Sequence, residues 1–106
     1  MKKVAVLGEE TFIRFFELIG AVGFPCKTPE EIRKKVNEII KSEEYSLIII
    51  PERFIESVRD IKEKLMREEK VEPIFAFFPD FVELEEKRIK ELKREIMLAI
   101  GVEMKV

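Results

Sequence analysis

The sequence contains no histidine, no glutamine and no tryptophan, and it holds only one cysteine, Cys26. Without histidine, the chain has no imidazole for general-base catalysis or for the common zinc sites. A single cysteine excludes an internal disulfide and a thiolate metal cluster. We therefore expect Cys26 to be a small buried residue rather than a reactive thiol.

Glycine is also scarce, and its placement excludes the common phosphate-binding loops. The four glycines are Gly8, Gly20, Gly23 and Gly101, and none of them lies in a dinucleotide-binding or P-loop pattern. The serines do not fall in a nucleophile-elbow pattern either. We expect no catalytic residues, no metal site and no bound cofactor.

Charge of one sign is not in excess. The chain has 20 basic and 22 acidic residues, a net charge of −2, which argues against general nucleic-acid binding. No apolar run approaches the ~20 residues of a membrane span, and no signal peptide is recognisable. We expect a cytoplasmic protein, or one that is peripheral on the cell membrane through a complex. The richness in Lys and Glu, with Asn37 as the only amide side chain, is typical of hyperthermophile proteins.

The most informative stretch is residues 46–51. Leu47 and the three isoleucines that follow it favour an extended strand, because β-branched residues suit the pleated backbone. The run does not alternate with polar residues, so both faces of the strand must be covered. That pattern indicates an inner strand of a parallel sheet with helices on each side, ended by Pro51.

The remaining segments alternate between strand and helix patterns. Further strands are predicted at residues 3–7, 21–26 and 74–78, the second of them weak and best suited to an edge. Helices are predicted at residues 11–19, 29–44, 52–67 and 82–100. The fold class is therefore α/β: a small, doubly wound, mostly parallel four-stranded sheet, receiver- or Rossmann-like, with a C-terminal amphipathic helix.

Two helices carry more detailed signals. Thr28 can cap the second helix, with Pro29 in its first position and Glu31 completing a capping box. In the third helix, Phe54, Val58, Ile61 and Leu65 repeat at helical spacing. We expect Ile55 and Met66 to widen this buried stripe.

Carboxylates follow several strands, at the edge where a doubly wound sheet binds ligands. These are Glu9 and Glu10, Glu52, and Asp80. A divalent-cation pocket like that of phospho-receiver domains is one interpretation, but Pro51 follows the third strand where a receiver needs aspartate. The simpler interpretation is that these acids face water at helix N-termini.

The last helix and tail, residues 82–106, are the longest and most charged part of the chain and are separable in principle from a sheet domain of residues 1–81. An apolar stripe is formed by Ile89, Leu92, Ile96 and Ile100, with Lys93 and Arg94 beside it. Two arrangements stay open: the helix packs on its own sheet, or it docks against the helices of a partner.

Taken in order, these features resemble a known family. The chain resembles the F subunit of the archaeal and vacuolar-type ATP synthases. The features that carry this resemblance are the strand of residues 3–7 closing at Gly8, the acidic turn at Glu9, the helix start at Thr28, the aliphatic strand of residues 47–50 and the paired prolines around residues 74–78. The likeness spans nearly the whole chain.

The resemblance implies a non-catalytic subunit of the central rotor shaft. Such a subunit binds the shaft subunit, turns inside the catalytic head, and uses its C-terminal helix as the mobile element that influences ATP hydrolysis. By this resemblance the contact residues are Ile89, Leu92, Lys93, Arg94, Ile96 and Ile100. It implies no nucleic-acid partner and no direct membrane insertion.

Two other interpretations stay open. A receiver-like regulatory domain predicts binding of Mg²⁺ or a phosphate analogue at Glu9, Glu10 and Glu52. An α/β adaptor that uses its last helix for self-association predicts a stable homodimer.

Overall fold

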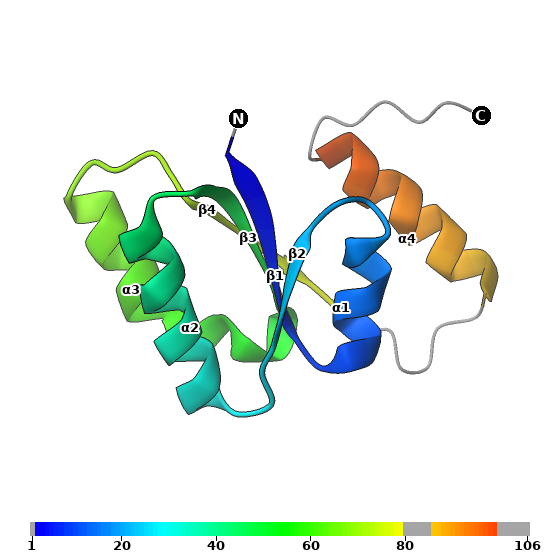
Figure 1. Cartoon of the computed structure of the whole chain (residues 1–106), viewed down its shortest axis with the longest axis horizontal. Coiled ribbons are helices and arrows are strands. Elements are labelled where there is room, and N and C mark those ends of the chain that lie inside the picture. The colour runs from blue at the N-terminus through cyan, green and yellow to red at the C-terminus, as the bar shows by residue number, and fades with distance from the viewer. Residues whose placement is uncertain (1, 80–85, 100–106) are drawn as a thin grey trace.

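Strands and helices alternate along the chain in the computed structural model, which describes residues 2–79 and 86–99 (Figure 1). The elements are β1 (Lys3–Gly8), α1 (Glu10–Glu17), β2 (Val22–Pro25), α2 (Pro29–Ser42), β3 (Tyr45–Pro51), a 3₁₀ turn (Glu52–Phe54), α3 (Ile55–Arg67), β4 (Ile74–Phe78) and α4 (Glu86–Ala99). The predicted β-α-β-α-β-α-β-α order is confirmed. The tail beyond α4 lies outside the described residues.

The four strands form one sheet in the order β2-β1-β3-β4, and every neighbouring pair is parallel. β3 lies between β1 and β4, and its isoleucines Ile48, Ile49 and Ile50 are fully buried, as the unbroken aliphatic run predicted. β2 is an edge strand, also as predicted. Pro51 pairs with Phe78 at the end of the ladder, so the proline is the last residue of β3.

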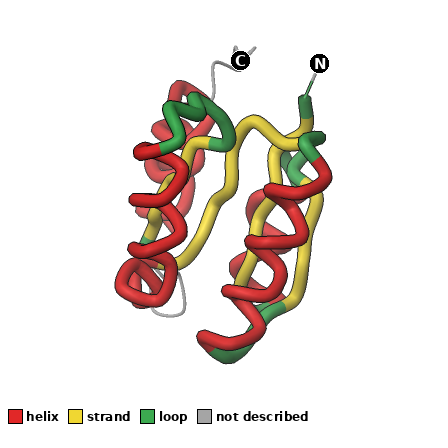
Figure 2. The backbone as a smooth tube through the Cα atoms, turned by 90° about the vertical axis from the view of Figure 1, so that its left-hand side faces the viewer, coloured by secondary structure: helices red, strands yellow, loops and turns green. Residues whose placement is uncertain are grey.

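Two helical layers cover the two faces of the sheet. Helices α2 and α3 pack on one face, and α1 and α4 on the other (Figure 1). Seen after a quarter turn, α2 and α3 run side by side in front of the sheet (Figure 2). Alternate residues of each inner strand enter opposite cores: Ile48 and Ile50 contact the α2–α3 side, while Ile49 contacts the α1–α4 side.

The start of α2 shows how local sequence sets an element. The Thr28 hydroxyl accepts a hydrogen bond from the Glu31 backbone N–H at 3.2 Å, and the Glu31 carboxylate accepts one from the Thr28 N–H at 3.2 Å. Pro29 occupies the first helical position. These contacts satisfy N–H groups that the first turn leaves unpaired, so the predicted capping box is confirmed.

The apolar stripe of α3 is narrower than the spacing predicted. Phe54, Val58, Ile61 and Leu65 are buried, but Ile55 is 36% exposed and Met66 is 68% exposed. The expectation that Ile55 and Met66 widen the buried stripe is wrong. The reason is the position of α3 at the end of the sheet: it covers the edge strand β4, and among the described strands none lies beyond β4 to receive its outer side.

Candidate functional site

The carboxyl ends of β1 and β3 form the topological switch point of the sheet. The chain leaves β1 for α1 on one face, and it leaves the neighbouring β3 for α3 on the other. In doubly wound folds this crevice is where ligands bind. The residues that line it are therefore the first candidates for chemistry.

The chain is closely packed at Gly8, where β1 ends. This residue has a φ of +144°, and a Cβ atom there would lie 3.0 Å from the Phe12 ring and 3.1 Å from Pro51. Only glycine is comfortable in that backbone conformation. Gly8 thus serves the tight passage from β1 to α1, with the apolar side chains of Phe12 and Pro51 beside it. A hollow of about 330 Å³ remains at this edge, between α1 and the end of β2, and Gly8, Glu9 and Glu10 are among its lining residues.

The carboxylates at this edge do not converge. The Arg53 guanidinium donates a hydrogen bond to Glu9 Oε1 at 3.3 Å, and Glu10 pairs with Arg14 on α1. Asp80 lies outside the described residues. Within residues 2–79 and 86–99, no group of three or more His, Cys, Asp or Glu side chains is arranged to hold a metal ion. The sequence singled out Glu9 but contained no signal that Arg53, 44 residues later, would pair with it.

Cys26 is buried, as predicted, and its thiol donates a weak hydrogen bond to the Glu31 carbonyl at 3.8 Å. Burial raises the pKa of the Cys26 thiol, with the Glu31 carboxylate adding to the effect. A raised pKa lowers the thiolate fraction at neutral pH, so the structure gives Cys26 no means of activation.

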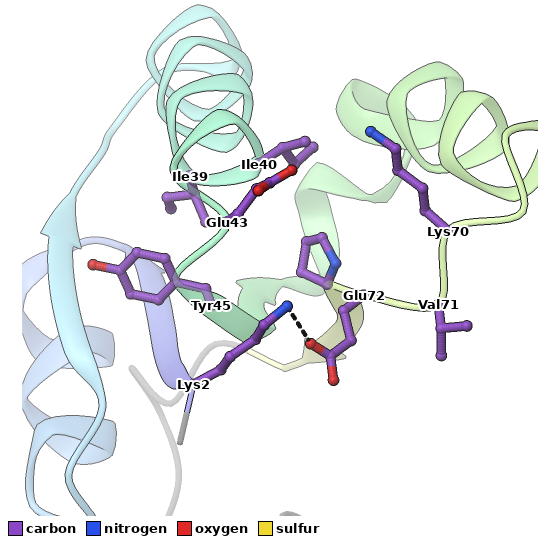
Figure 3. Close-up of a pocket in the computed structure, with 9 residues that line it drawn as sticks. Lys2, Ile39, Ile40, Glu43, Tyr45, Lys70, Val71 and Glu72 are labelled. Carbon is purple, nitrogen blue, oxygen red and sulfur yellow. Dashed lines mark ion pairs between the residues drawn. The ribbon is translucent and has the colours of Figure 1, made fainter.

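A second hollow, of about 540 Å³, opens at the opposite edge, beside the amino ends of β1, β3 and β4 (Figure 3). Its wall combines the end of α2 with the segment that leads into β4, and Tyr45 stands at its side (Figure 3). The Lys2 ammonium and the Glu72 carboxylate form an ion pair across it at 2.9 Å. Its nine lining residues include no serine, threonine, cysteine or histidine, so the hollow holds neither the usual hydroxyl and thiol nucleophiles of hydrolases nor an imidazole base.

The predicted contact residues on the last helix fall in three groups. Ile96 is fully buried in the α1–α4 core with Phe16 and Ile49, so its side chain faces the sheet. Lys93 is half-buried and Arg94 is exposed. Ile89 and Leu92 belong to α4, but their side chains lie outside what the structure describes, and Ile100 lies outside the described residues altogether.

No helix in the part of the chain that the structure describes is long and apolar enough to cross a membrane.

Comparison with known proteins places the chain in a family. The family model described as "ATP synthase (F/14-kDa) subunit" matches residues 4–96. The F subunit of the A-type ATP synthase of Thermococcus kodakarensis is 37% identical over 111 residues, covering 97% of this chain and 98% of that protein. The corresponding protein of Methanocaldococcus jannaschii is 36% identical over 109 residues, covering 97% of this chain and 99% of that protein. That of Archaeoglobus fulgidus is 30% identical, covering 98% of both chains. The chain therefore belongs to the ATP synthase F/14-kDa subunit family, as the resemblance in its sequence predicted.

Proposed function

We propose that this protein is a non-catalytic subunit of the central stalk of an A-type ATP synthase. In this role it binds the shaft subunit, meets the catalytic head, and couples or regulates ATP turnover with ion transport. The observation that carries the proposal is end-to-end similarity to the F subunits of A-type ATP synthases, at 30–37% identity over 97–98% of the chain.

The non-catalytic part of the proposal is supported by the switch-point crevice. Phe12 and Pro51 lie against Gly8 there, and Glu9 is paired with Arg53. A sheet edge that has no glycine-rich phosphate-binding loop, and whose Glu9 is already charge-paired, is poorly suited to binding nucleotide. ATP chemistry would then belong to other subunits of the complex.

We further propose that α4 takes part in partner binding. Arg94 is exposed and Lys93 half-buried, so both are candidates for electrostatic contacts while the helix lies on the sheet. Ile96 can reach a partner only if α4 leaves the sheet, because its side chain is fully buried there. This arrangement suits a helix that changes between two docking surfaces, its own sheet and a partner. Ile89, Leu92 and Ile100 remain candidates because they share the helical spacing of the apolar stripe that contains Ile96.

The proposal includes location. The protein would be cytoplasmic and peripheral on the cell membrane, held there by the other subunits of the complex, with neither nucleic-acid binding nor direct membrane insertion.

The test is co-purification of the full-length tagged chain with the ATP synthase from source membranes. We expect the wild-type chain to recover the shaft subunit and the catalytic head. The double variant Lys93→Glu with Arg94→Glu should recover less of the shaft subunit and change the ATPase rate. Lys34→Glu with Lys41→Glu, which reverses two exposed charges on α2, is the matched control.

Two results would separate the parts of the proposal. If the wild-type chain recovers no shaft subunit, the central-stalk role is wrong. If the α4 variant behaves like the α2 control, the stalk role stands, but the charges of α4 do not contribute to it.

A further inference from the structure

Four of the large apolar side chains that the structure leaves exposed gather at one end of the molecule. Ile55 and Met66 lie on α3, Val71 lies in the connection to β4, and Ile74 begins β4. Their exposed fractions are 36%, 68%, 82% and 56%. Exposed apolar residues scattered singly need no explanation, but a cluster of this kind marks an interaction surface.

The cluster is hollowed into two adjoining grooves. One, of about 280 Å³, runs between Ile55, Met66 and Phe77. The other, of about 200 Å³, runs between Met66, Val71 and Ile74. Both are lined by Lys62 and Met66, so the two hollows adjoin each other, and we name them together the α3–β4 groove. Ile55 and Met66 are eleven residues apart on α3, so the groove is about 16 Å long, the length of three helical turns.

Lys62 is the cation that the α3–β4 groove offers to a partner. Its lining includes Arg59, Lys62 and Lys70 against a single acidic residue, Glu63. Arg59 is paired with Glu56 and Lys70 with Glu68. Lys62 lies over the Phe77 ring at 5.7 Å, and no carboxylate among the described residues pairs with it. The groove thus presents an apolar floor with an available cation at its middle.

We propose that the α3–β4 groove binds an acidic amphipathic α-helix of another subunit of the ATP synthase. Three turns of such a helix match the groove in length, and its apolar anchors would cover Ile55 and Met66. Its carboxylates would meet Lys62. A second copy of this chain is a poorer occupant, because the groove of a second copy offers Lys62 another lysine rather than a carboxylate.

The inference rests on membership of the complex, not on the central-stalk role. Helix α3, which forms one wall of the α3–β4 groove, packs on the opposite face of the sheet from α4, so the groove is distinct from the surface that α4 covers (Figure 1).

The first test is photo-crosslinking in the intact complex. Benzoylphenylalanine replaces Val71 in the full-length chain, and the same probe at Leu18 is the control, since Leu18 is 75% exposed and follows α1 on the other face. We expect the probe at 71 to cross-link to an acidic amphipathic helix of another subunit, and the probe at 18 not to reach that segment. A cross-link to a second copy, to this chain's own tail, to a segment of other character, or to nothing overturns the proposal.

The second test measures the affinity of the full-length chain for complex depleted of it. Lys62→Glu should weaken binding about three- to tenfold, more at low salt than at high salt. Met66→Glu should weaken it by about tenfold or more, because a carboxylate would be desolvated in an apolar groove. Lys64→Glu and Leu18→Glu, at exposed positions that do not line the groove, should change it less than about twofold. Equal effects of Lys62→Glu and Lys64→Glu overturn the proposal.

These outcomes are distinguishable from failure of the proposed function. A cross-link from residue 71 to a helix of a peripheral subunit would keep the groove proposal and refute the central-stalk role. A chain that copurifies with the shaft but does not cross-link from residue 71 would keep the central-stalk role and refute the groove proposal.

Discussion

Arg33 on α2 makes three hydrogen bonds to α3. Its guanidinium donates to both carboxylate oxygens of Asp60 on α3, at 2.6 and 3.0 Å, and to the Ser57 carbonyl at 2.8 Å. The two-pronged geometry is the strong form of this contact. These bonds tie the two helices that cover one face of the sheet.

The same contact makes a pH-dependent contribution to stability. The hydrogen bonds from Arg33 lower the pKa of the Asp60 carboxyl below its ordinary value. A group whose pKa is lowered by folding stabilises the folded state above its unfolded pKa. That contribution is lost as the pH falls through the folded value, here below about pH 4.

We predict that Asp60→Asn removes this part of the acid sensitivity. The melting temperature of the wild type should drop more steeply between neutral pH and about pH 2–3 than that of the variant, as followed by circular dichroism. The difference should be small, since both side chains are partly exposed. Glu56→Gln, an exposed carboxylate on the same helix, is the control. Parallel curves for wild type and Asp60→Asn would contradict the assignment.

At the scale of elements, α4 joins the core of the α1 face through Ile96. This side chain is fully buried in that core, while Leu98 two residues later is 67% exposed. The attachment of α4 to the sheet is thus expected to depend on Ile96.

We predict that Ile96→Ala costs about 2–5 kcal/mol of unfolding free energy, as is usual for truncating a buried isoleucine. Leu98→Ala should change it by no more than about 0.5 kcal/mol. Denaturant unfolding can be followed by the emission of Tyr45, the only tyrosine in a chain without tryptophan. Equal effects of the two substitutions would mean that α4 does not share the core of the sheet in solution, and would favour a separable last helix.

At the scale of the whole molecule, the doubly wound topology is shared by proteins of very different function, so the fold alone does not identify the activity. A phospho-receiver domain needs an aspartate at the carboxyl end of its third strand. Here β3 ends in Pro51 rather than in an acidic residue, and Glu9 already has Arg53 as a partner.

We predict that Mg²⁺ at about 10 mM, with or without a phosphate analogue, shifts the melting temperature by no more than about 1 °C. A binding site on the folded state would raise the melting temperature in proportion to the logarithm of the free ligand concentration.

The adaptor interpretation is tested by the oligomeric state. We expect light scattering after size exclusion to give the mass of a monomer. A Mg²⁺-dependent stabilisation that Glu9→Gln abolishes would restore the receiver interpretation, and a stable dimer would restore the adaptor.

Local sequence was sufficient for most of the elements. The unbroken run of residues 47–50 located an inner strand, because only a strand covered on both faces uses four consecutive large aliphatic residues. The Thr28 capping box located the start of α2 through contacts between residues three positions apart. The family resemblance, spread over the whole chain, was also visible in the order of these local features.

Only the tertiary structure determines which residues that are far apart in the sequence come into contact. Periodicity placed Ile55 and Met66 in the buried stripe of α3, yet they are exposed, because the order β2-β1-β3-β4 leaves α3 at the end of the sheet. Strand order and the pairing of Arg53 with Glu9 depend on long-range contacts that leave no periodic trace. The need for glycine at position 23 also depends on a long-range contact, because a Cβ there would come within 2.3 Å of Ile13 on α1. Burial patterns report how much of a residue is covered, but only tertiary packing determines what covers it.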